Sequence, residues 1–180
     1  MNQKITTLLN YAFIILVLFS AGCSSEQTQP KMSFGCNIET IYWKNLSVSY
    51  KFPNAHSGNY VSKLNKDSPY SAALDLPVRE ISSKPLKRAK ITAWFMCTSN
   101  ASVQNLVCDI RDSSMQNSVE WIGVDAADFS IELNKWSKAE LIIDLTKNNR
   151  NNLSYVYRIY AFNDKDDPVY VDDFDVSFED

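Results

Sequence analysis

The sequence predicts an all-β domain, an antiparallel β-sandwich or jelly roll of nine or ten strands. Beyond residue 35, apolar side chains alternate with polar ones far more often than they follow the helical period of about 3.6 residues. Short segments rich in Asn, Asp, Ser and Pro separate these runs, as expected of turns. No helical segments alternate with the runs, which favours antiparallel sheets over a parallel α/β fold.

The expected strands are short and together fill most of the chain after residue 37. They cover residues 38–43, 46–52, 60–64, 70–76, 89–97, 106–110, 119–124, 129–133, 155–162 and 169–178. One further segment carries two opposing signals. Ser137 and Glu140 have the spacing of a capping box, which starts helices. Ile142 and Ile143 are β-branched and favour a strand. Because the segment is short, we predict a strand rather than a helix.

The composition indicates one ordered domain and excludes several classes of function. The chain has 180 residues, of which 45% are hydrophobic and 22% charged, so it can build a core and is not disordered. Its net charge of −3 argues against nucleic-acid binding, which needs a basic surface. With one His and four separated Gly, it has no two-His metal motif and no Gly-rich phosphate loop. A GxSxG nucleophile motif is also missing. We predict that the protein is not an enzyme.

The N-terminus is typical of an export signal. Lys4 is the only charge before Glu26, and an unbroken apolar run covers residues 11–19. A helix of that length rises about 14 Å, too little to cross a hydrocarbon core of about 30 Å, so the run fits a signal peptide. The sequence Ala-Gly-Cys at 21–23 resembles the lipobox of bacterial lipoproteins, although Ser20 stands where Leu is usual. The resemblance implies cleavage just before Cys23 and lipid on that residue. The alternative is ordinary cleavage that leaves a plain thiol.

These features divide the chain into a signal peptide at 1–22, a polar flexible tether at 23–34 and a β-sandwich domain at 35–180. Lipid on Cys23 implies attachment to a membrane of the bacterial cell envelope, and we expect the outer membrane, on its periplasmic or surface face. An acidic body is not expected to bind anionic phospholipid. The lipid alone is therefore expected to hold the protein at the membrane.

Three landmarks occur in order along the body of the chain. The first is residues 37–43, which include Glu39; the second is the sequence AHSGNY at 55–60; the third is residues 169–176. Together they resemble the galactose-binding-like jelly-roll domains, the fold of many carbohydrate-binding modules, and the resemblance spans residues 36–180. It implies a domain that binds carbohydrate without catalysis.

In that family a calcium ion commonly ties the first and last strands to the loop between them. The resemblance implies one carboxylate ligand from Glu39 and another from Asp172 or Asp173. Backbone carbonyls near Ser57 and Gly58 would complete the shell. Carboxylate and carbonyl oxygens are the ligands that Ca²⁺ prefers. Any such ion is expected to be structural.

Asp172 is expected to be buried. Phe174 and Phe178 should face the core, and the alternation of a strand places Asp172 on the same side. A buried carboxylate needs a partner, for which calcium is one candidate and backbone amides or a Lys are the other. The single His, His56, falls in the loop before Gly58 and is expected to pack rather than to catalyse. Gly58 is expected to supply a positive φ or a close packing contact.

Aromatic side chains are the candidates for sugar binding, because aromatic rings stack on the faces of pyranose rings. We predict ligand-binding roles for Trp94, Trp121, Tyr155 and Tyr157; for each of them the alternative is a place in the core. The expected partner is a polysaccharide. The alternative function is a structural lipoprotein that interacts with a surface protein complex and binds no small ligand.

The cysteines other than Cys23 leave one pairing open. If the strands at 89–97 and 106–110 form a hairpin, Cys97 and Cys108 lie near each other, and a cross-strand disulfide is one of two alternatives. The alternative is that both are small buried apolar side chains. Cys36 would then be free or buried.

Overall fold

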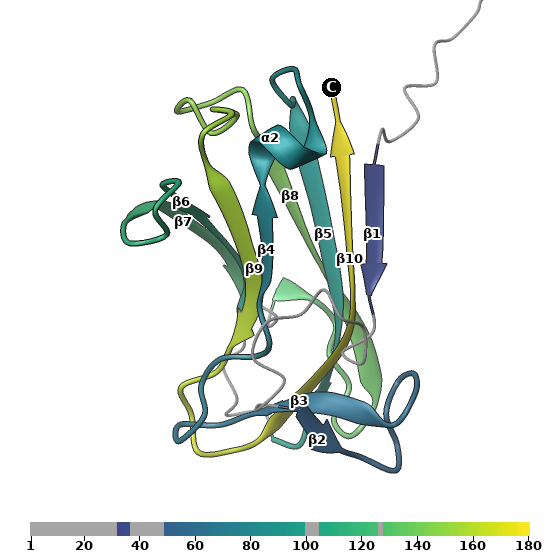
Figure 1. Cartoon of the computed structure of the whole chain (residues 1–180). Helices are drawn as coiled ribbons and strands as arrows, with labels where there is room; N and C mark the ends of the chain where they lie inside the picture. Colours follow the sequence, from purple (N-terminus) through teal and green to yellow (C-terminus); the bar gives the residue numbers. More distant parts are fainter. Residues whose placement is uncertain (1–31, 37–48, 100–104, 126–127) are drawn as a thin grey trace, which may run out of the picture.

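The computed structural model describes residues 32–36, 49–99, 105–125 and 128–180. In this part of the chain, ten strands form two sheets of six and four strands that lie face to face (Figure 1). All the strand pairs are antiparallel. The predicted all-β fold, an antiparallel sandwich of the jelly-roll type, is confirmed.

The six-stranded sheet is organised around its longest strand, β10. Its members are β1 (Met32–Cys36), β2 (Ser49–Lys51), β3 (Tyr60–Leu64), β10 (Val169–Glu179), β5 (Arg88–Cys97) and β8 (Trp136–Asp144). One side of β10 pairs with β5, which pairs in turn with β8. The other side pairs first with β3 and then with β1, while β2 pairs with β3.

The four-stranded sheet faces β10 and β5 across the core. Its members in spatial order are β4 (Leu74–Pro77), β9 (Val156–Phe162), β6 (Asn105–Arg111) and β7 (Ser118–Asp125). A single helical turn, α2 (Val78–Ile81), follows β4. Within the described part of the chain, no helix is long and apolar enough to cross a membrane.

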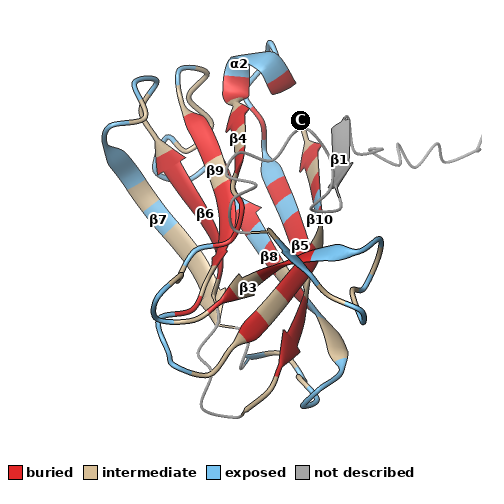
Figure 2. Ribbon diagram, turned by 60° about the horizontal axis from the view of Figure 1, so that its bottom comes forward, coloured by how far each residue is buried: buried red, intermediate tan, exposed pale blue. Residues whose placement is uncertain are grey.

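The core lies between the sheets, and the pleat of each strand decides which side chains enter it. Buried residues alternate with more exposed ones along the first part of β5 and along β10 (Figure 2). Phe95, Phe174, Phe178 and Tyr157 are among the largest side chains that are fully buried. Each buried side chain of this size stabilises the fold by about 1.5–3 kcal/mol relative to an exposed position. Aromatic side chains therefore supply much of the core.

The segment with opposing helix and strand signals forms β8. It pairs with β5 along its whole length, from Trp136 to Asp144. Leu141 and Ile143 enter the core, whereas Ile142 between them is 57% exposed. This two-residue alternation matches a half-buried strand, and the strand prediction is confirmed.

Two expectations about the strands are wrong. Residues 129–133 form no strand, because the N–H of Ile131 donates to the carbonyl of Phe129 at 2.8 Å, closing a three-residue turn. The sheet also begins earlier than expected, since β1 includes residues 32–34, which were assigned to the tether. The strand expected at 38–43 lies outside the described residues.

The two cysteine-bearing strands do not pair as a hairpin. Cys97 is on β5 in the six-stranded sheet, whereas Cys108 is on β6, which pairs with β7 and β9. Both side chains are buried and pack in the core, and burial raises the pKa of the Cys108 thiol. The condition for a disulfide between them is therefore not met, and the structure shows the alternative of two small buried side chains.

Candidate functional site

The outward face of the four-stranded sheet carries a cleft of about 430 Å³. Side chains on this face alternate along each strand with side chains of the core. On β9, for example, Arg158 and Tyr160 line the cleft, whereas Ile159 belongs to the core. The residues that line the cleft are Tyr70, Ser71, Ala73, Asp109, Arg111, Arg158 and Tyr160.

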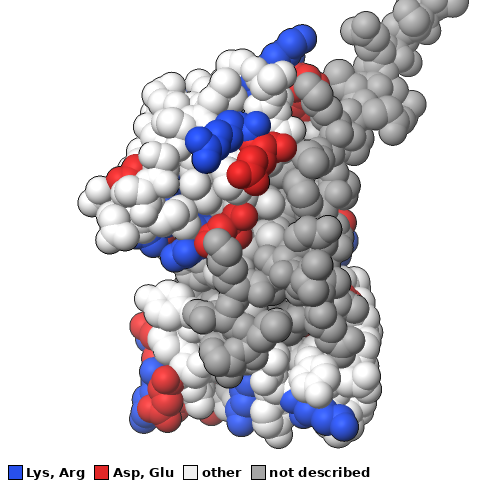
Figure 3. Space-filling model, viewed as in Figure 1, with Lys and Arg blue, Asp and Glu red and all other residues white. Residues whose placement is uncertain are grey.

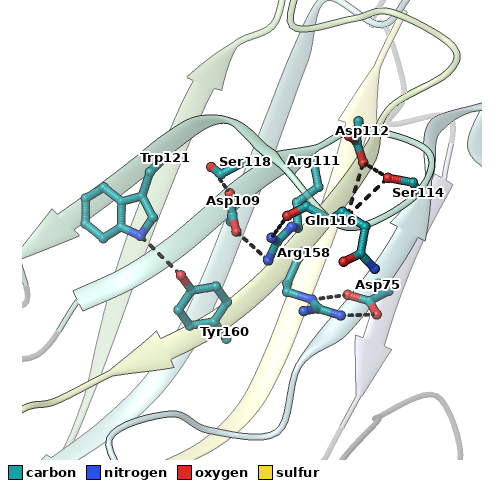
Figure 4. A network of polar contacts seen from close by, with 10 residues as sticks. All are labelled: Asp75, Asp109, Arg111, Asp112, Ser114, Gln116, Ser118, Trp121, Arg158 and Tyr160. Carbon is teal, nitrogen blue, oxygen red and sulfur yellow. Dashed lines mark hydrogen bonds and ion pairs between the residues drawn. The ribbon is translucent and has the colours of Figure 1, made fainter.

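The strand register places four residues in one row across this face (Figure 4). Asp75 on β4 lies opposite Arg158 on β9. Asp109 on β6 lies between Arg158 and Trp121, which is on β7. The row joins the indole ring at the edge strand to the charged groups of the cleft floor.

The charged groups in the floor neutralise one another. The Arg158 guanidinium donates two hydrogen bonds to Asp75, from Nε at 2.7 Å and from Nη2 at 2.9 Å. Arg111 forms an ion pair with Asp109 at 3.3 Å, and the Ser118 hydroxyl donates to the same carboxylate. The hydrogen bonds to Asp75 raise the pKa of Arg158 above its usual value. Arg111, Arg158 and Asp109 thus make a floor that is rich in hydrogen-bonding groups. Asp75 lies beside this floor, and with it the charges of the two arginines are balanced.

The β6–β7 hairpin positions Arg111 beside this floor. The Asp112 carboxylate accepts hydrogen bonds from the Ser114 hydroxyl and the Asn117 amide, both at 2.7 Å. These bonds, the one from Ser114 foremost, lower the pKa of Asp112 to about 2. The carbonyl of Gln116 accepts a hydrogen bond from Arg111 Nη2 at 3.3 Å. The guanidinium of Arg111 is therefore restrained by the hairpin as well as by Asp109.

Aromatic rings flank the charged floor. Trp121 is 51% exposed, and its Nε1–H donates a hydrogen bond to the Tyr160 hydroxyl at 3.1 Å. Tyr70 is 53% exposed, and its ring meets that of Tyr160 edge-on at 5.7 Å between centroids. Burial raises the pKa of Tyr160, so its hydroxyl stays protonated. Tyr160 is thus flanked by two exposed aromatic rings.

The four aromatic residues predicted to bind a ligand are not brought together. Trp121 stands on the outward face just described, and Tyr155 lines a smaller hollow of about 190 Å³ at the end of the same sheet. Tyr157 is 1% exposed, and its ring packs on Phe178 at 5.9 Å. This burial excludes Tyr157 as a platform for a ligand. Trp94 lies on β5 in the other sheet.

Tyr70, Tyr160 and Arg158 were not among the predicted site residues. For β9 the signal was present in the alternation of the strand. Arg158 is charged and so marks the solvent side, which puts Tyr160 on that side and Tyr157 in the core. No such signal existed for the pairing of Arg158 with Asp75, because the two are 83 residues apart in sequence.

A second cluster surrounds the loop between β2 and β3. The His56 ring stacks on Trp94 with 4.0 Å between centroids, and its Nδ1–H donates to the Asp173 carboxylate. The Trp136 indole donates to the carbonyl of Asn54 at 2.8 Å. Gly58 in the same loop has a φ of 58°, the left-handed region that Gly adopts without strain. These contacts hold the loop against the six-stranded sheet and cover Trp94.

Asp172 is fully buried, as expected, but for a different reason. A bulge follows Asp172 in β10, and Asp173 there has a φ of 43°. The extra residue shifts the alternation, so that Val171 and Phe174 both enter the core while Asp172 points to the other side. Its carboxylate accepts hydrogen bonds from the backbone N–H groups of Ser57 at 3.0 Å and Asp173 at 2.9 Å. Desolvation raises the pKa of Asp172.

The predicted calcium ligands fall only partly within the described residues. Asp172 and Asp173 lie beside Ser57, whose hydroxyl donates to Asp173 at 2.6 Å. Among the described residues, each oxygen of the two carboxylates accepts one hydrogen bond. Glu39 and Cys23 lie outside the described residues, among which no three acids, His or Cys group as metal ligands. The calcium site needs Glu39 and stays a prediction.

No protein-family model matches the chain, and no curated protein sequence matches it. Solved structures do match it in fold. The CBM22-2 xylan-binding domain from Paenibacillus barcinonensis Xyn10C has a TM-score of 0.51 over 81% of this chain and 98% of that domain, at 17% identity. The CBM22-1 xylan-binding domain of the same protein has a TM-score of 0.50 over 81% of this chain and 93% of that domain, at 10% identity.

This chain has the fold of these two CBM22 domains. The tandem of the two Paenibacillus domains gives the same result, with a TM-score of 0.52 over 81% of this chain and 49% of that chain, at 16% identity. The resemblance in fold that the sequence landmarks predicted is confirmed. A shared fold does not specify a ligand, which depends on the residues of the cleft.

Proposed function

We propose that this chain is a non-catalytic domain that binds a polysaccharide on the outward face of its four-stranded sheet. The observation that carries the proposal is the exposed indole of Trp121, hydrogen-bonded to Tyr160 at the margin of a cleft with a polar floor. A pyranose ring has an apolar face of C–H groups, which suits the negative face of an aromatic ring. Its hydroxyls suit the Arg and Asp groups of the floor, which offer donors and acceptors side by side.

The charge balance of the cleft favours a neutral glycan. Arg158 is paired with Asp75, and Arg111 with Asp109, so within the described lining both guanidiniums are already compensated. The chain has a net charge of −3, and side chains of both signs are interspersed on the face seen in Figure 3. An acidic polymer would lose hydration and meet a repulsive field without gaining a new ion pair. We therefore assign the site to neutral sugar polymers.

The likeness in fold supports the same class of ligand. Both Paenibacillus domains are described as xylan-binding, which is a property of those proteins. Fold does not specify a ligand, since one architecture serves many functions. Xylan is therefore the first polysaccharide to test, followed by other neutral glycans such as galactan, mannan and mixed-linkage glucan.

Affinity electrophoresis of the purified chain through gels that contain each polysaccharide tests this proposal. Trp121→Ala is expected to weaken binding at least tenfold, about 1.4 kcal/mol, because the platform is removed. The control is Tyr50→Ala, which removes an aromatic ring of similar exposure, 46%, from β2 in the other sheet. It should be retained like the wild type. Failure of the folded wild type to be retarded by any neutral glycan, or unchanged retention of Trp121→Ala, would refute the proposal.

The same experiment separates the alternative function. A lipoprotein that interacts with a surface protein complex and binds no small ligand would pass through every gel unretarded. In that case cross-linking in intact cells would be the way to find the partner. Retardation that depends on Trp121 is the result expected here.

Lipid attachment at Cys23 and a place in the cell envelope complete the proposal. The lipobox-like sequence at 21–23 supports them. When the full chain is expressed in a bacterium, it is expected in the membrane fraction and to incorporate labelled palmitate. Cys23→Ser is expected in the soluble fraction without label. Label or membrane association that persists in Cys23→Ser would refute the anchor.

A further inference from the structure

Gly123 occupies the middle of β7, where glycine is an unfavourable choice. Its neighbours Ile122 and Val124 are β-branched and suit a strand, whereas a glycine inside a strand weakens it. Glycine at such a position often marks the close approach of another group. Another group is therefore expected to lie close to the backbone at Gly123.

The group that approaches Gly123 is the indole of Trp121. The two residues are two positions apart on one strand and so share the outward face. A Cβ on residue 123 would lie 2.4 Å from Cη2 of the indole, 2.7 Å from Cζ3 and 3.0 Å from Cζ2. Carbon atoms in contact are normally about 3.5–4.0 Å apart. The six-membered ring thus lies closer to the strand than any side chain at position 123 would allow.

The pyrrole side of the same indole is held by Tyr160. Its Nε1–H donates to the Tyr160 hydroxyl at 3.1 Å, and Tyr160 is on β9, beyond β6 in the sheet. With one end on Gly123 and the other on Tyr160, the indole lies along the sheet, and 51% of Trp121 stays exposed. The Tyr160 hydroxyl accepts this bond through a lone pair, so its own hydrogen remains to be donated into the cleft.

We propose that Gly123 is a positioning residue, whose missing side chain lets the Trp121 indole lie flat on the sheet as a platform for a sugar ring. This inference rests on the proposed function. A methyl group at position 123 would push the ring away by roughly 1 Å. The Nε1–H···Oη distance, already 3.1 Å, would then pass out of hydrogen-bond range. Gly123 acts through Trp121 and needs no contact with the glycan.

Gly123→Ala in the purified chain is the test, with xylan as the first probe. The Kd is expected to rise at least tenfold, while the melting temperature stays within about 2 °C, because Ala suits a strand better than Gly does. Val119→Ala is the matched control on the same strand, since Val119 is 47% exposed and lies on the other side of Trp121. It should bind like the wild type. In the Trp121→Ala background, Gly123→Ala should cause no further loss.

An NMR measurement without ligand reports the position of the Trp121 indole separately from glycan binding. The Nε1–H resonance of Trp121, assigned by its loss in Trp121→Ala, is expected to shift and to exchange faster with solvent in Gly123→Ala. The role of Gly123 is overturned if the wild type binds glycan and Gly123→Ala binds it equally tightly. It is also overturned if Gly123→Ala weakens binding equally in the wild type and in the Trp121→Ala background. Either result leaves the proposed function standing. Wild type that binds no glycan overturns both, and the resonance then reports only how the indole packs.

Discussion

Replacing Asp75 by Ala removes the acceptor of both hydrogen bonds that Arg158, a residue of the cleft floor, donates to it. The Asp75 side chain is 6% exposed and that of Arg158 is 32% exposed, so the guanidinium would be left half-buried without its main partner. Removing one member of a fully buried pair costs about 3–5 kcal/mol of unfolding free energy, whereas an exposed pair contributes about 0–1 kcal/mol. The structure places this pair between these limits.

Two features reduce the cost from the buried limit. One third of Arg158 is open to water, which partly replaces the lost carboxylate, and Asp109 lies opposite it on β6 and still attracts it. We therefore expect Asp75→Ala to lower the unfolding free energy by about 1–2 kcal/mol. For a chain of this size, each kcal/mol lowers the melting temperature by about 2–4 °C, so the expected fall is about 2–8 °C.

Urea unfolding and thermal melting of the same samples measure this loss. Glu132→Ala is the control, because Glu132 and Lys135 form an ion pair in which both side chains are 68% exposed, and its loss should cost less than about 0.5 kcal/mol. The double variant Asp75→Ala with Arg158→Ala should recover part of the stability, since no unpaired charge remains. If Asp75→Ala lowers the unfolding free energy no more than Glu132→Ala does, the Asp75–Arg158 pair does not stabilise the fold and this explanation is wrong.

Three further predictions concern the core, the pH dependence and the metal. Tyr157→Phe removes the hydroxyl that donates to the Arg150 carbonyl at 3.0 Å, and should cost about 1 kcal/mol in urea unfolding without changing glycan retention; reduced retention would return Tyr157 to the site. The Arg150 hydrogen bonds lower the pKa of Glu120, so this pair stabilises the fold above the unfolded pKa of about 4.3 and the stabilisation is lost as the pH falls through the folded pKa. Glu120→Gln should therefore reduce the dependence of the melting temperature on pH between about pH 5 and pH 3. An unchanged slope of melting temperature against pH contradicts this account. Removal of calcium with EDTA is expected to lower the melting temperature, because a bound ion stabilises the folded state, and a melting temperature that EDTA leaves unchanged eliminates the ion.

Asp172 illustrates how a correct expectation can rest on incomplete reasoning. Counting back from Phe174 by strict alternation put Asp172 in the core, and Asp172 is indeed buried. Its burial comes instead from the loop that carries Ser57, which covers the opposite side of β10 at a bulge. A bulge inserts one residue and reverses the alternation, and the left-handed φ of Asp173 that accompanies it has no strong signal at an Asp. Alternation alone therefore does not predict which side of the sheet a residue faces beyond a bulge.

The aromatic residues show where composition is insufficient. Tyr157 and Trp121 are both large aromatic residues in the middle of strands, yet one is 1% exposed and the other 51%. The charge of Arg158 was enough to assign the two sides of β9, and this would have moved Tyr157 to the core and Tyr160 to the site. Trp121 is on β7, which is the edge strand of the four-stranded sheet among the described residues. No local pattern identifies an edge strand, because the edge is decided by how the other strands pair.

Local patterns were enough to predict the all-β class, the approximate number of strands and the strand character of β8, because alternation is a property of each segment alone. They were also enough to recognise the fold. The cleft is different in kind. Its row of Asp75, Arg158, Asp109 and Trp121 exists because β4, β9, β6 and β7 become neighbours in one register. That register is set by contacts among residues far apart in the chain, and a slip of one residue would turn every one of these side chains into the core.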